Sequence, residues 1–175
     1  IMDIKKKSQK VRDEGLDKFY TLPECSKKCI DKTCELYDIS KWDLIVEPSA
    51  GNGSFLIQIP SDNKIGLDIL PDNENIIKQD FLDYNPPLNK DAILVIGNPP
   101  FGRQSSTAIR FIKKACSFAT SVSFILPKSF LNCHYDSIPL RTRAYVLVNN
   151  ITENTIPKKY LDITPLDPRT NSYYS

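Results

Sequence analysis

The stretch Ala92-Ile93-Leu94-Val95-Ile96-Gly97-Asn98-Pro99-Pro100-Phe101-Gly102 places an amide, two prolines and an aromatic ring directly after an apolar run. The run at residues 92–96 predicts a buried parallel strand, because such strands carry nearly continuous apolar sequence. In open α/β sheets, ligands bind beyond the carboxyl ends of the strands. Two prolines stiffen the loop that follows. We therefore expect Asn98 and Phe101 to face a flat ligand with a polar edge.

A simple turn is the competing interpretation of this loop. Asn and Pro are common turn residues, and four-residue motifs often arise by chance. The two interpretations differ in whether a cofactor site precedes the loop in the chain.

Length and composition set the broad class. A chain of 175 residues suits a single domain spanning 1–175. The net charge of +2 permits a nucleic-acid substrate without requiring one. No apolar run approaches the ~18 residues that span a bilayer, so we expect a soluble intracellular protein, cytoplasmic or nuclear, with no membrane partner. The five cysteines are odd in number and lack a C-x-x-C pair, so we expect buried thiols and no metal site.

The first part of the chain predicts an arm and a helix. Residues 1–15 are polar and charged, which is typical of a flexible arm. Residues 22–37 predict a helix with Thr21 as its N-cap, Pro23 in the first turn and Glu24 completing a capping box.

A loop rich in small residues follows the next apolar run. Residues 42–47 predict a strand, and residues 48–54, here called the glycine loop, precede a short helical segment. Gly51 and Gly53 let the backbone approach a ligand, and the amides at the helix start would bind a carboxylate. Glu47 would accept a hydrogen bond from a ligand ammonium. The third glycine of the phosphate-binding G-x-G-x-x-G pattern is absent here, and so is a Gly-Lys-Ser/Thr sequence. Both absences disfavour dinucleotides and nucleoside triphosphates as ligands.

Two further predicted strands end in acidic residues. Residues 64–69 contain Asp68, placed to bind both hydroxyls of a ribose, and residues 76–82 contain Asp80 and Phe81, suited to the edge and face of an adenine. The alternative is that both aspartates cap turns and Phe81 belongs to the core. The short connections between residues 54 and 76 predict an abbreviated part of the sheet.

The rest of the chain again shows helix and strand signals in turn. Residues 108–116 predict an amphipathic helix, residues 121–126 a buried strand and residues 143–148 a sixth strand. Residues 131–175 otherwise show little periodicity, so the C-terminal part of the sheet is not placed.

Glu47-Pro48-Ser49-Ala50-Gly51-Asn52-Gly53, Gly66-Leu67-Asp68, Gln79-Asp80-Phe81 and Asn98-Pro99-Pro100-Phe101 together resemble class I S-adenosylmethionine-dependent methyltransferases of the adenine-N6 type. The resemblance implies a Rossmann-like α/β fold, with a mostly parallel central sheet and helices on both faces, and S-adenosylmethionine as cofactor. It implies catalytic roles for Asn98, Pro99, Pro100 and Phe101. It implies cofactor binding by Phe19, Tyr20, Thr21, Glu47, Pro48, Ala50, Gly51, Gly53, Asp68, Ile69, Asp80, Phe81 and Asn98.

The substrate stays open at this level. Families with this motif methylate adenine in DNA, adenine in RNA or a glutamine side chain in proteins, and the loops here resemble DNA enzymes slightly more. Basic residues near or after the motif would contact phosphates: Arg103, Lys113, Lys114, Lys128, Arg141 and Arg143. No target-recognition domain is visible, so specificity would come from a partner protein, a missing segment or the tail. An inactive methyltransferase-like binding subunit is the non-enzyme alternative.

Overall fold

The computed structural model describes residues 11–13, 16–18, 20–126 and 143–148, and in the three short segments 11–13, 16–18 and 143–148 it describes the backbone alone. Strands β1 (Val11–Asp13) and β2 (Leu16–Lys18) form an antiparallel pair of their own. Residues 11–13, expected within the arm, therefore form a strand. No helix in the described ranges is both long and apolar enough to cross a membrane.

The main sheet has six strands in the order β5-β4-β3-β6-β7-β8, and each neighbouring pair is parallel. The strands are β3 (Leu44–Glu47), β4 (Lys64–Asp68), β5 (Ile77–Lys78), β6 (Ile93–Gly97), β7 (Ser121–Leu126) and β8 (Arg143–Val148). Counted along the chain, this is the 3-2-1-4-5-6 order of doubly wound sheets, whose direction of winding reverses between β3 and β6. The predicted α/β class and parallel sheet are confirmed.

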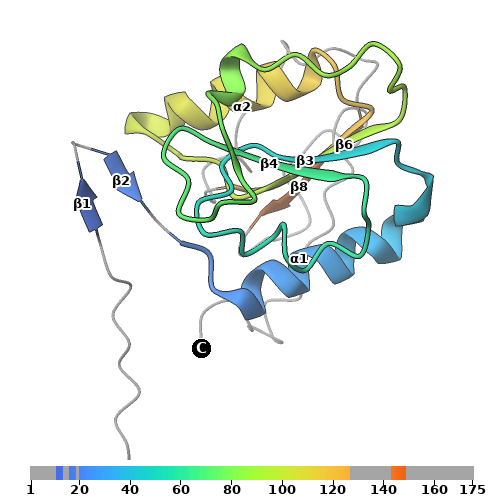
Figure 1. Cartoon of the computed structure of the whole chain (residues 1–175), viewed down its shortest axis with the longest axis horizontal. Helices are drawn as coiled ribbons and strands as arrows, with labels where there is room; N and C mark the ends of the chain where they lie inside the picture. The colour runs from blue at the N-terminus through green and yellow to red at the C-terminus, as the bar shows by residue number, and fades with distance from the viewer. Residues whose placement is uncertain (1–10, 14–15, 19, 127–142, 149–175) are drawn as a thin grey trace, which may run out of the picture.

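Two helices cover opposite faces of this sheet, α1 (Pro23–Leu36) on one and α2 (Ser106–Cys116) on the other (Figure 1). Side chains alternate between the faces, as the pleat of a strand requires. Leu44 and Val46 of β3 belong to the cluster that contains Phe111 of α2. Ile45, between them, packs in the cluster with Ile30 of α1. Burial on both faces explains why the central strands read as continuous apolar runs.

The helix predicted at residues 22–37 is confirmed, but its predicted cap is wrong. Leu22 occupies the N-cap position without a side-chain capping bond, and Pro23 begins the helix. Proline fits there because the first helical N–H has no partner within the helix. Thr21 lies one residue too early to cap, and its hydroxyl contacts Asn98 instead.

The abbreviated edge is shorter than the sequence predicted. The helix expected after Gly53 is a run of turns, in which the Ile57 amide donates to the Gly53 carbonyl at 3.0 Å. The strand expected at residues 76–82 shrinks to the two residues of β5, and the 3₁₀ helix η2 (Phe81–Asp83) follows it. Two other 3₁₀ turns are η1 (Ile39–Lys41) and η3 (Arg103–Ser105).

A buried pair of hydroxyls joins α1 to the sheet. Thr33 donates to the Cys29 carbonyl at 2.8 Å, and its oxygen lies 2.9 Å from Ser123 Oγ of β7. Because Thr33 has a single hydroxyl proton, Ser123 is the donor in this pair. Both residues are buried, and the Ser123 hydroxyl depends on Thr33 for its hydrogen bond.

Thr33→Val should lower the free energy of unfolding by about 1–3 kcal/mol, because it leaves the buried Ser123 hydroxyl without its partner. Urea denaturation measures this change. The double variant Thr33→Val/Ser123→Ala should recover part of the loss, since it removes both polar groups. A single variant as stable as the wild type, within error, would contradict this role for the pair.

Candidate functional site

The reversal between β3 and β6 brings two loops together at the carboxyl edge of the sheet. The strands pair in register, with Val46 opposite Val95, so the glycine loop and the loop at residues 98–101 leave side by side. Ser49 Oγ of the glycine loop donates to the Asn98 carbonyl oxygen at 3.0 Å. A Cβ at Gly97 would lie 3.4 Å from the Glu47 side chain, so the two strand ends are closely packed. The two predicted loops therefore lie next to each other at this edge of the sheet.

Asn98 presents a single open acceptor at this site. Its Nδ2 donates to Thr21 Oγ1 at 3.1 Å. Its Oδ1 is buried and has no hydrogen-bond partner among the described residues. Buried polar atoms in folded proteins are almost always bonded. Asn98 Oδ1 is therefore a buried acceptor without a partner at the carboxyl edge, and an N–H group that reached it would satisfy it.

Glu47 faces the interior. It is 2% exposed, and its Oε2 accepts from the Leu56 amide at 2.8 Å. Burial raises the pKa of Glu47 to about 8, against the opposing effect of the Leu56 and Phe55 amides, and the charge of Asp68 raises it further. The carboxyl thus holds its proton near neutral pH and braces the turn after the glycine loop. Its role toward a ligand ammonium stays a prediction.

Asp68 also braces the glycine loop. Its Oδ2 accepts from the Gly51 amide and its Oδ1 from the Leu70 amide, each at 2.8 Å. Each carboxylate oxygen keeps a second lone pair, so the half-buried group retains acceptor capacity for ligand hydroxyls. The neighbouring Ile69 is 45% exposed at the same strand end. Binding of a ribose by Asp68 stays a prediction.

Asp80 and Phe81 lie on either side of the start of η2, and their side chains have different surroundings. Asp80 is exposed, and its Oδ1 accepts from the Leu82 amide at 2.8 Å as the cap of η2. Phe81 is 1% exposed, and its ring centroid lies 5.2 Å from that of Phe111. The prediction that this ring covers the face of an adenine is corrected, because the 3₁₀ turn directs the ring into the core beneath α2.

The amides of the glycine loop are largely bonded within the protein, contrary to the expectation of open N–H groups. Gly51 donates to Asp68, Gly53 donates to the Ala50 carbonyl at 2.6 Å, and Ser54 donates to Asn52 Oδ1 at 3.2 Å. Gly51 and Gly53 have positive φ angles of 52° and 85°, which only glycine adopts freely. Within the loop, Pro48 and Ala50 are buried.

The segment before α1 lies against this loop. A Cβ on Gly51 would lie 3.4 Å from the ring of Tyr20, whose hydroxyl donates to the Asp72 carboxylate. The Asp72 amide donates in turn to the Gly51 carbonyl at 3.0 Å. Tyr20 and Thr21 therefore lie beside the glycine loop and Asn98, and their binding of a cofactor stays a prediction. Phe19 is outside the described residues.

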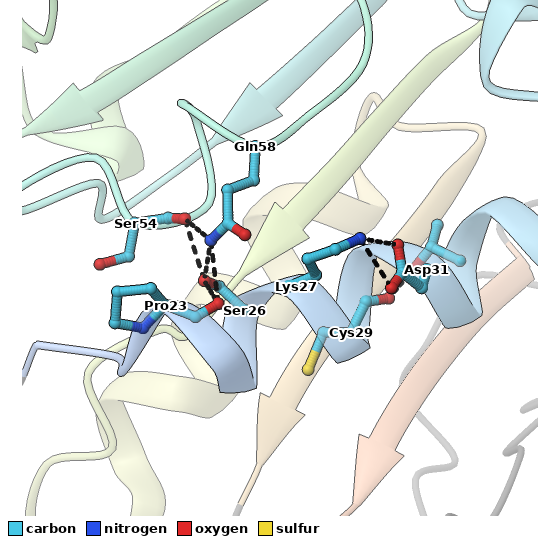
Figure 2. Close-up of polar contacts among 8 residues, drawn as sticks. Pro23, Ser26, Lys27, Cys29, Asp31, Ser54 and Gln58 are labelled. Atoms are coloured by element: carbon cyan, nitrogen blue, oxygen red, sulfur yellow. Dashed lines mark hydrogen bonds and ion pairs between the residues drawn. The ribbon is translucent and has the colours of Figure 1, made fainter.

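A second network ties the first turn of α1 to the turn after the glycine loop (Figure 2). Ser26 Oγ donates to the Ser54 carbonyl at 2.9 Å and accepts from Gln58 Nε2 at 2.7 Å. Gln58 also reaches the Pro23 carbonyl at 3.0 Å. Sequence reasoning missed these residues, as it missed Ser49 and Asp72. The available signal was Ser26 itself, a polar residue on the apolar side of a helix.

Phe101 is held at the start of α2. Its carbonyl accepts from the amides of Thr107 and Ala108 at 3.2 and 3.3 Å, and its ring is 38% exposed. Gly102 follows with φ of 68°, and a Cβ there would lie 2.2 Å from Thr107 Oγ1. Pro99 is buried and Pro100 exposed. An exposed ring on a fixed backbone provides a surface for a flat ligand.

The described part of the chain contains no cluster of three or more His, Cys, Asp or Glu side chains that could hold a metal ion. Of the cysteines, Cys29 and Cys116 are buried and Cys25 and Cys34 half-buried, while Cys133 lies outside the described residues. No family model, curated protein or solved structure matches this chain.

Glu47→Gln should change how stability depends on pH. Between the ordinary carboxyl pKa of 4.5 and the folded-state pKa of about 8, the folded protein keeps a proton that the unfolded chain loses. Wild-type stability should therefore fall by on the order of a few kcal/mol as pH rises across this window. Gln, which does not titrate, should remove that fall.

Urea denaturation at several pH values from 4.5 to 8.5 tests this prediction. The two proteins should be similar in stability at the acidic end, and the variant should be the more stable at the alkaline end. Glu24→Gln, at an exposed position in the first turn of α1, is the matched control. If the free energy of unfolding changed with pH in the same way for wild type and Glu47→Gln, a protonated Glu47 carboxyl would be ruled out.

Proposed function

We propose that this chain transfers a methyl group from S-adenosylmethionine to the N6 amino group of adenine in nucleic acid, with DNA slightly favoured over RNA. The observation that carries the proposal is the buried, open Oδ1 of Asn98 beside the glycine loop. The doubly wound strand order supports a Rossmann-like class I methyltransferase fold, because such sheets bind ligands where the winding reverses.

The residues at the reversal suit an amino-group substrate. Asn98 Oδ1 and the Pro99 carbonyl would each accept an N–H, which turns the nitrogen lone pair away from the loop and toward the methyl donor. S-adenosylmethionine, when bound, would supply a methyl on a sulfonium sulfur: the S–CH₃ bond breaks as the N–CH₃ bond forms, the sulfur departs as a neutral thioether, and the amino nitrogen releases one proton to solvent. Positioning contributes most to such a transfer. The chain therefore needs a rigid pair of acceptors more than a strong base.

The cofactor would lie along the strand ends. Asp68 would hold the ribose hydroxyls with its remaining lone pairs, and the exposed Asp80 would accept from the adenine amino group. Ile69, exposed at the end of β4, offers an apolar contact that the buried Phe81 ring does not. Tyr20 would cover the methionine end from its place against Gly51.

Recognition of the target base would use Phe101. Stacking of a base on an aromatic ring contributes about 1–3 kcal/mol, and a base in a duplex must first be flipped out. Arg103 is exposed two residues after Phe101 and is placed to contact phosphates, whereas Lys113, also exposed, lies near the far end of α2. Lys128 and Arg141 lie outside the described residues. Target specificity would come from a partner protein or a further segment.

Two alternatives use the same site differently. A glutamine side-chain amide also offers N–H groups to Asn98, but it gains less than a base from the exposed ring of Phe101. An inactive binding subunit would not need the buried acceptor that Asn98 keeps. Both alternatives give distinct results in one set of assays.

Calorimetry should show that the chain binds S-adenosylmethionine, alone or with nucleic acid. Methyl transfer to DNA, RNA and a glutamine-containing peptide should then be followed by mass spectrometry of the products. We expect N6-methyladenine, and we expect Asn98→Ala to lower kcat by about 10²–10³-fold, as for loss of one transition-state hydrogen bond.

Asn89→Ala, in an exposed loop before β6 and so at the opposite edge of the sheet, is the matched control. It should retain wild-type kcat. Methylated glutamine without methylated adenine would overturn the adenine assignment. A chain that never binds S-adenosylmethionine could not be the proposed enzyme.

A further inference from the structure

We propose that Thr21 is a positioning residue: it orients the Asn98 side chain so that the amide oxygen, and not the NH₂ group, faces the substrate. This inference rests on the proposed function and deepens it, since it names the residue that makes the site selective for hydrogen-bond donors. The resemblance to methyltransferases assigned Thr21 to the cofactor instead.

Asn98 is held at two points, one on its side chain and one on its main chain. Thr21 Oγ1 accepts from Nδ2 at 3.1 Å, and Ser49 Oγ donates to the main-chain carbonyl at 3.0 Å. A side-chain amide carries its donor and its acceptor at the two ends of one planar group. Holding the nitrogen on Thr21 therefore determines where the oxygen points, and that oxygen is the buried atom left open.

Thr21 lies on a backbone that is itself fixed on both sides. Tyr20, the residue before it, is bonded to Asp72 and packs against Gly51. Leu22, the residue after it, accepts from the Cys25 amide at 2.9 Å as the cap of α1. The network of Figure 2 then fastens the first turn of that helix to Ser54. These contacts hold Thr21 in place for a partner 77 positions later in the chain.

The orientation decides which ligand chemistry the site accepts. With oxygen toward the ligand, Asn98 binds groups that offer N–H, such as the exocyclic amine of adenine. With the NH₂ group toward the ligand, it would bind carbonyl oxygens and ring nitrogens and would repel an amine. An unpaired buried acceptor also weakens complexes with ligands that have no N–H to give. Thr21 thus contributes to substrate choice without touching the substrate.

Thr21→Val keeps the shape of the side chain and removes the acceptor, and Thr21→Ser keeps the acceptor. We expect Thr21→Val to lower kcat for methyl transfer while the Kd for S-adenosylmethionine stays as in the wild type, and Thr21→Ser to restore kcat. Thr120→Val is the matched control. Its hydroxyl bonds the Asp91 carbonyl and the Ile93 amide at the opposite edge of the sheet, so it should leave kcat unchanged.

A double-mutant cycle separates positioning from cofactor binding. In an Asn98→Ala background, Thr21→Val should have no further effect on kcat, because the residue through which it acts is gone. Additive losses, or a weaker Kd for S-adenosylmethionine in Thr21→Val with kcat preserved, would overturn the positioning role and leave the proposed function intact.

The hydrogen bond between Thr21 and Asn98 can also be tested without any substrate. In ¹⁵N-edited NMR spectra, the Asn98 side-chain NH₂ signals, identified by their loss in Asn98→Ala, should exchange with solvent about two- to tenfold faster in Thr21→Val, as loss of one hydrogen bond implies. Unchanged exchange would overturn the positioning role by itself. A wild type that shows this contact but no methyl transfer would overturn the proposed function, and with it the catalytic purpose of the contact.

Discussion

The parallel pairing of β3 with β6 is the constraint on which the rest of the site depends. The two strands are buried on both faces and are separated in the chain by the whole β4–β5 edge. Their pairing sends the glycine loop and the Asn98 loop out of the sheet at the same place. A slip of one residue would turn every side chain to the other face, so the alternating contacts with α1 and α2 keep the two loops in register.

Backbone amides satisfy most of the acidic groups at this edge. Glu47, Asp68 and Asp80 each accept from a main-chain N–H of a neighbouring turn. Such turns are stiff, because the main-chain N–H of each turn is bonded to a carboxyl group that is itself fixed in place. Asn98 differs from them, since its donor is bonded and its acceptor is open. This edge of the sheet therefore combines turns braced by carboxyl groups with one buried acceptor that has no partner among the described residues.

The central strands and both helices could be predicted from sequence because their signal is local: apolar runs for β3, β6 and β7, and helical spacing for α1 and α2. The residues that were mispredicted depend on contacts between distant segments. Thr21 has the sequence of a helix cap, and its partner is instead Asn98. Phe81 follows an acidic strand end, but only the packing of η2 beneath α2 determines where its ring points. Ser49 and Gln58 gave no local signal, since small polar residues are ordinary in loops.

The protonated state of Glu47 has a consequence for any cation that comes to rest beside it. The carboxyl holds its proton up to about pH 8 while it is buried against the Leu56 amide. A positive ligand group placed next to it would favour the anion, and at neutral pH the proton would be expelled into solution. The heat of binding would then depend on the ionisation enthalpy of the buffer, and affinity would rise with pH. A single buried acid would thereby couple the binding of a cation beside the glycine loop to the proton concentration around the protein.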